Sequence, residues 1–108
     1  MNIAAERDAE GYLLDPETWD EIIADEMARE EGIVLNDTYW IAINFMRNYL
    51  REHDIAPDVR HLIRHMATES GCTKKEAKKI VFDLFPYGYV KQACKIAGMK
   101  KNRAWSTG

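Results

Sequence analysis

Residues 84–108 read LFPYGYVKQACKIAGMKKNRAWSTG. Pro86 and Gly88 predict a turn, because the proline ends the preceding helix and the glycine permits the bend that follows. Small and apolar residues then recur at i, i+3, i+4 and i+7, which predicts one face of a short helix. This face consists of Val90, Ala93, Cys94 and Ala97. A basic, aromatic tail follows, so we expect the helix to lead into a C-terminal arm of residues 99–108.

Upstream, apolar periodicity and capping residues predict four further helices. Asp15 and Pro16 begin the first, since aspartate caps helices and proline suits the first helical position. Thr73 and Glu76 have the spacing of a capping box at the start of the fourth. The expected helices cover residues 16–31, 37–53, 57–69 and 73–84, and a short extended segment is expected at 11–14.

This pattern predicts one mainly α domain covering residues 1–108, a compact helical bundle. A small α+β element at the N-terminus stays open. The two helices that flank Gly71 have the lengths and the short turn of a helix-turn-helix-like element. The predicted architecture is therefore a bundle with this element and a C-terminal arm.

The composition favours a protein that is neither exported nor inserted in a membrane. No apolar run approaches the roughly 18 residues that span a bilayer. Residues 1–8 lack the basic and then apolar regions of a signal peptide. The two cysteines, Cys72 and Cys94, indicate reduced thiols rather than a disulfide framework. We therefore expect a cytoplasmic protein.

The charges of the two halves of the chain are opposite. Residues 1–54 hold four Lys/Arg against fourteen Asp/Glu, and residues 55–108 hold eleven against four. This asymmetry favours an anionic partner for the basic half, either a nucleic acid or an acidic protein. The other interpretation is that the two halves neutralise each other across the folded surface.

Two segments resemble the DsrC/TusE/DsvC family of sulfur-relay proteins, which are similar to the gamma subunit of dissimilatory sulfite reductase. They are residues 84–98, with their Phe-Pro, Gly and Lys-Gln-Ala-Cys spacing, and residues 55–60, Ile-Ala-Pro-Asp-Val-Arg. The resemblance implies a small helical domain with a C-terminal arm. It also implies that sulfur is relayed between proteins, toward tRNA thiolation or alongside sulfite reductase, without a cofactor.

In this family a second cysteine, eleven positions after the first, carries the persulfide. Here that position is Trp105, and an indole cannot replace the thiolate that persulfide chemistry needs. The resemblance therefore implies an accessory or regulatory docking protein rather than an enzyme. Cys94 remains as a candidate thiol. Either it accepts sulfur, with Lys91 and Lys95 favouring its thiolate, or it fills a gap in the core.

Partner-binding residues are expected on the last helix and the arm. Tryptophan and arginine are frequent anchors of binding surfaces, and the arm carries both. Trp105 either plugs a partner's cleft or packs on its own domain, and the sequence does not separate these interpretations. The predicted partner-binding residues are Lys91, Lys95, Lys100, Lys101, Arg103 and Trp105.

A DNA-binding regulator is the alternative function. The helix-turn-helix-like element carries basic residues where such elements contact phosphates. Its second helix lacks Asn, Gln or Arg on the exposed face to read base edges, so binding would have little sequence preference. The candidate residues are Arg60, Arg64, Lys74, Lys75, Lys78 and Lys79.

The histidines offer a weaker pattern. His61 and His65 stand at i, i+4, a spacing that lets two imidazoles share one face of a helix and hold a metal ion. Neither a third ligand nor the glutamate of a zinc-hydrolase motif stands nearby. No metal site is expected.

Overall fold

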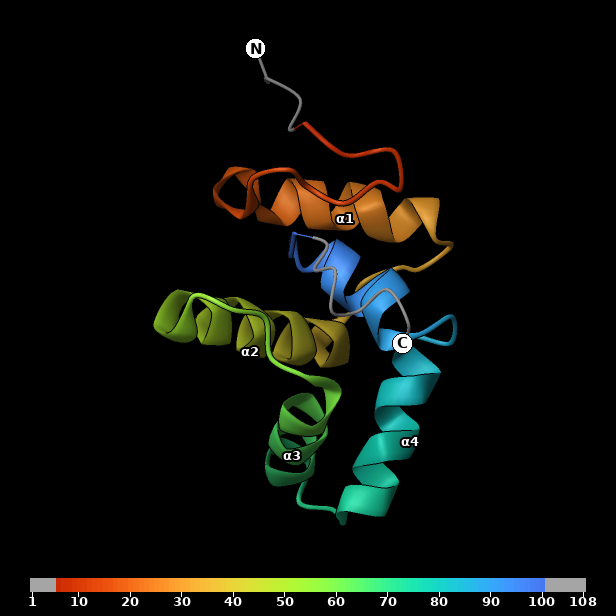
Figure 1. The fold of residues 1–108 in the computed structure, drawn as a ribbon. Helices are drawn as coiled ribbons and strands as arrows, with labels where there is room; N and C mark the ends of the chain where they lie inside the picture. The colour runs from red at the N-terminus through yellow and green to blue at the C-terminus, as the bar shows by residue number, and fades with distance from the viewer. Residues whose placement is uncertain (1–5, 101–108) are drawn as a thin grey trace.

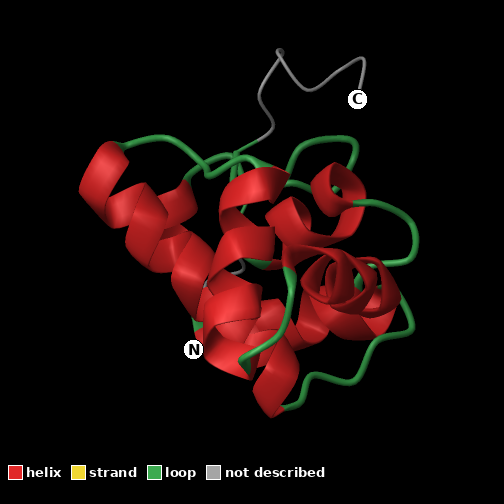
Figure 2. Cartoon of the chain, turned by 90° about the horizontal axis from the view of Figure 1, so that it is seen from below, coloured by secondary structure: helices red, strands yellow, loops and turns green. Residues whose placement is uncertain are grey.

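The computed structural model describes residues 6–100, and helices dominate this part of the chain (Figure 1). Figure 2 shows the helices joined by short loops, with no strand among the described residues. None of these helices is both long and apolar enough to cross a bilayer. The predicted mainly α fold is confirmed. Its elements are η1 (Pro16–Thr18), α1 (Glu21–Glu30), α2 (Asp37–His53), α3 (Val59–Ser70), α4 (Lys74–Leu84) and the π-helix η2 (Tyr89–Cys94).

Local capping sets most helix boundaries. The Asn36 side chain accepts the Tyr39 amide at 3.1 Å and begins α2. Thr73 and Glu76 form the predicted capping box, each accepting the other's backbone N–H, at 3.0 and 3.1 Å. Gly71 ends α3 in the left-handed region, with φ +63°, where only glycine avoids a Cβ penalty. These signals were sufficient to predict α2 and α4. The third helix was predicted to begin at Pro57, but Asp58 caps it and α3 begins at Val59.

The prediction of one helix starting at Pro16 is wrong, because the structure divides it. A short 3-10 turn, η1, is followed by extended backbone at Trp19 and Asp20, and α1 begins only then. The Asp20 carboxylate accepts the Ile23 amide at 2.8 Å and caps α1. The indole N–H of Trp19 donates to the Ile96 carbonyl at 2.9 Å. A second cap and a tertiary hydrogen bond therefore interrupt the helix that the periodicity predicts.

The last helical segment is enclosed by the other helices. In Figure 1 it lies between α1 on one side and α2 and α4 on the other. Ala93, Cys94 and Ala97 of the predicted face are fully buried, whereas Val90 is only partly buried. Gln92 and Ile96, which lie outside that face, are fully buried as well, and the exposed Lys91 marks the side that faces solvent. The buried surface of this segment is therefore wider than the predicted apolar stripe, because it includes the polar Gln92.

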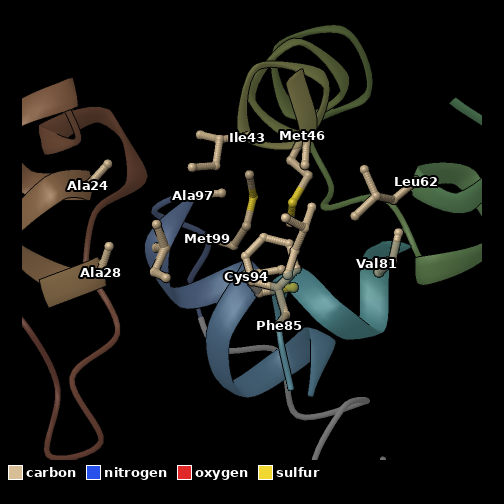
Figure 3. Packing of buried hydrophobic residues seen from close by; sticks show 14 of the residues in the cluster. Ala24, Ala28, Ile43, Met46, Leu62, Val81, Phe85, Cys94, Ala97 and Met99 are labelled. Carbon is tan, nitrogen blue, oxygen red and sulfur yellow. The ribbon is translucent and has the colours of Figure 1, made fainter. Parts of the chain in front are cut away.

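The hydrophobic core forms around this central segment (Figure 3). Cys94 and Phe85 lie close to Met46 of α2, and Leu62 and Val81 reach in from α3 and α4. On the far side of the segment, α1 closes the core with Ala24, Met27 and Ala28. Near the N-terminus, a short extended segment was expected at residues 11–14. In the described part of the chain, it takes the form of one isolated antiparallel bridge between residues 7 and 13.

Candidate functional site

Cys94 lies inside the core. Its side chain has no exposed surface, and Figure 3 shows it beside Phe85. The hydroxyl of Tyr89 donates to the Pro57 carbonyl and lies within hydrogen-bonding reach of the Cys94 sulfur. The sulfur is therefore surrounded by protein rather than presented to a partner.

Burial raises the pKa of the Cys94 thiol to about 12, and the hydrogen bond with Tyr89 opposes this shift only in part. Because the thiolate is the nucleophile, a thiol that stays protonated near neutral pH accepts sulfur poorly. The lysines named as helpers do not offset burial. The Lys95 ammonium lies 3.8 Å from the Glu31 carboxylate, and Lys91 points to the surface. Reaction at Cys94 would need local opening of the core.

Lys91 and Lys95 share a surface hollow of about 360 Å³. The Lys95 ammonium lies 5.2 Å from the centroid of the Tyr12 ring, and the Tyr12 hydroxyl donates to the Val90 carbonyl at 3.0 Å. Two cations, two carboxylates and two phenol rings thus face one space, a mixture that suits a polar peptide segment. The lining residues are Glu10, Tyr12, Glu31, Tyr87, Lys91 and Lys95.

A buried amide supports the wall of this hollow. Gln92 donates from Nε2 to Glu31 Oε1 at 3.1 Å, and its Oε1 accepts the Tyr87 amide at 3.0 Å. Among the described residues, Gln92 is the polar residue that is fully buried. Both the nitrogen and the oxygen of its amide are hydrogen-bonded. It therefore joins α1, the 85–88 turn and η2 through one side chain. This role of Gln92 was not predicted from the sequence, because its partners are 61 and 5 residues away.

The backbone that follows η2 is held in place by contacts from two directions. Arg47 donates to the carbonyls of Ala97 and Pro16, each at 3.1 Å, and its guanidinium lies 4.5 Å from the centroid of the Trp19 ring. Gly98, with φ +76°, packs against this indole so closely that a Cβ would lie 2.3 Å from Trp19 Cδ1. The point where the chain leaves the core is therefore fixed. Arg47 was not singled out from the sequence.

The arm was predicted from residue 99, but Met99 is only 1% exposed and belongs to the core. Lys100 is exposed. Three of the predicted partner-binding residues, Lys101, Arg103 and Trp105, lie outside the described residues.

The six basic residues of the DNA-binding alternative are all exposed on α3 and α4. Two of them are engaged locally. Arg60 pairs with the Asp58 carboxylate at 2.8 Å, and Lys79 pairs with Asp83 at 2.9 Å. The structure thus places these residues on neighbouring helices, but their local carboxylates reduce the charge available for phosphates.

The histidines serve local packing. His61 Nδ1 accepts the Asp58 amide at 3.2 Å and completes a capping box for α3. The His65 ring stacks on Phe45 of α2, with centroids 4.4 Å apart. Within residues 6–100, no three His, Cys, Asp or Glu side chains converge in a way that would hold a metal ion.

Comparison with known proteins gives consistent matches over most of the chain. The family model described as DsrC like protein matches residues 2–104. The protein Sulfurtransferase TusE of Pectobacterium atrosepticum is 40% identical over 94 residues, which are 87% of this chain and 85% of that protein. Its namesake in Sodalis glossinidius is 43% identical over 94 residues, covering 87% and 86%.

Two solved structures share the fold. DsrC from Allochromatium vinosum has a TM-score of 0.78 and 40% identity, over 91% of this chain and 87% of that one. The oxidized gamma-subunit of the dissimilatory sulfite reductase (DsrC) from Archaeoglobus fulgidus has a TM-score of 0.77 and 32% identity, over 91% and 89%. With the sequence segments, the helical fold and these matches in agreement, the chain belongs to the DsrC-like family of sulfur-relay proteins.

Proposed function

We propose that this chain docks on protein partners of a sulfur-transfer pathway in the cytoplasm and regulates them, without carrying the persulfide itself. The observation that carries the proposal is the complete burial of Cys94. The relatives are named sulfurtransferases or a subunit of sulfite reductase, so partners of either type fit. The choice between tRNA thiolation and sulfite chemistry depends on which partner is bound.

Two features keep this chain from carrying the persulfide. Sulfane sulfur moves when a thiolate attacks the outer sulfur of a donor persulfide and the donor thiolate leaves. Cys94 is held as a thiol by burial, and no donor can reach it in the folded state. At position 105, where the resemblance implies the carrier cysteine, this chain has tryptophan.

The proposed docking surface lies beside η2. Lys91, Lys95 and their hollow offer a contact surface among the described residues, and Lys100 adds an exposed cation. Lys101, Arg103 and Trp105 are part of the same proposal. Such a surface holds a polar partner by charge and shape rather than by covalent chemistry.

One assay tests both halves of the proposal. A persulfidated sulfur-relay donor is mixed with this chain, and intact mass is measured. We expect no gain of a sulfur atom. In the same relay with a complete TusE, an excess of this chain should slow sulfur transfer to TusE by competing for the donor.

Lys91→Glu/Lys95→Glu is expected to relieve the competition, while Glu69→Lys, a charge change on exposed α3, should not. A stoichiometric gain of sulfur that disappears in Cys94→Ser would contradict the non-carrier half. Competition that is absent with wild-type protein would contradict the docking half.

A further inference from the structure

The outer face of α4 carries a phenylalanine in solvent. Phe82 is 50% exposed, whereas Ala77, Val81 and Leu84 of the same helix face the core. A single exposed apolar residue is ordinary on protein surfaces. What distinguishes Phe82 is the set of charges around it.

Lysines surround this ring on the same helical face. Lys75, Lys78 and Lys79 stand seven, four and three positions before Phe82, which places all four side chains on one side of the helix. The Lys78 ammonium lies 5.7 Å from the centroid of the ring. Lys79 is paired with Asp83, and no carboxylate of the described residues pairs with Lys75 or Lys78. This face of α4 is therefore an exposed phenyl group with lysine ammonium groups around it.

The chemistry of this face selects its partner. Two copies meeting face to face would place lysines against lysines, so a symmetric dimer is disfavoured. A nucleic acid would find no Arg, Asn or Gln on α4 to read base edges. An acidic protein surface with an apolar socket satisfies both the ring and the ammonium groups.

We propose that the α4 face of Lys75, Lys78, Lys79 and Phe82 is a second docking surface, which binds an acidic protein partner by inserting Phe82 into an apolar socket. Residues at i, i+3, i+4 and i+7 are the usual contacts of a helix that lies in a groove. This surface consists of residues other than those of the hollow at Lys91 and Lys95. The proposal therefore stands or fails separately from the docking proposed above.

The probe is a labelled amphipathic helical peptide with a leucine stripe flanked by glutamates, and binding is followed by fluorescence anisotropy. Wild-type protein is expected to bind it, and Phe82→Ser should weaken binding about tenfold or more, the effect of losing a central anchor. Lys75→Glu/Lys78→Glu should weaken it most at low salt. A peptide with serine in place of leucine should bind wild-type protein about as weakly as the leucine peptide binds Phe82→Ser.

Ile22→Ser is the matched control, since Ile22 is an apolar residue of α1 that is 61% exposed and belongs to neither proposed docking surface. It should leave binding unchanged, and circular dichroism should show the same helix content in all variants. The proposal is overturned if wild-type protein does not bind the peptide, or if Phe82→Ser and Ile22→Ser behave alike. Tighter binding to single-stranded DNA than to the peptide would also overturn it.

Discussion

Gly98→Ala is expected to destabilise the fold by about 2–5 kcal/mol. Left-handed backbone costs a non-glycine residue about 1–2 kcal/mol, and Gly98 has φ +76°. The new methyl group would also lie 2.3 Å from Trp19 Cδ1, and overpacking of this kind costs about 1–3 kcal/mol. The indole cannot withdraw freely, because its N–H is bonded to Ile96. Urea unfolding measured by far-UV circular dichroism gives the difference.

Gly32→Ala separates the two causes. Gly32 has nearly the same φ, +75°, but nothing lies within 4 Å of a Cβ built there. This control should lose only about 1–2 kcal/mol, the cost of left-handed backbone. Equal losses in the two variants would show that the Gly98–Trp19 contact does not contribute. The conclusion that this contact fixes the backbone at Gly98 would then be wrong.

Gln92→Glu is expected to cost about 3–5 kcal/mol at about pH 8, the penalty typical of an uncompensated buried charge. The change replaces the amide donor, 3.1 Å from Glu31 Oε1, by a second carboxylate. Since burial and a neighbouring anion both disfavour ionisation, the pKa of the new carboxyl should rise well above its value in the unfolded chain. Thermal and urea unfolding across the pH range measure the loss.

The sign of the pH dependence follows from this raised pKa. The penalty is complete above the folded-state pKa of the new carboxyl, and it disappears as the pH falls below about 4, its unfolded value. The double variant Gln92→Glu/Glu31→Gln restores one donor opposite one carboxylate and should recover at least half of the loss. A pH-independent loss, or no recovery in the double variant, would contradict the proposed network.

Much of the fold follows from local signals in the sequence. Asn36, Thr73 with Glu76, and Gly71 act within a few residues of where they stand, so their effects are visible in a linear reading. The apolar faces of α2, α3 and α4 follow in the same way. The failure at Trp19 has the opposite origin. Its partner, Ile96, is 77 residues away, and no local pattern announces such a contact.

The candidate site was predictable only in part. Cys94 was found from its motif, but its burial depends on α1, α2 and α4, which lie on different sides of η2. A one-sided apolar pattern cannot show this. No role was predicted for Arg47, because its hydrogen bonds to two distant carbonyls appear only in three dimensions. Phe82 was visible in the sequence, yet its significance comes from the lysines that share its face.

The reactivity of Cys94 in the native protein tests the account most directly. With a pKa of about 12, only about one Cys94 thiol in ten thousand is ionised at about pH 8, and the core excludes the reagent. In Cys72→Ser protein, iodoacetamide should leave Cys94 unlabelled by intact mass while the fold persists, and should label it completely in urea. Native protein that is labelled as fast as unfolded protein would mean that this sulfur is open to attack.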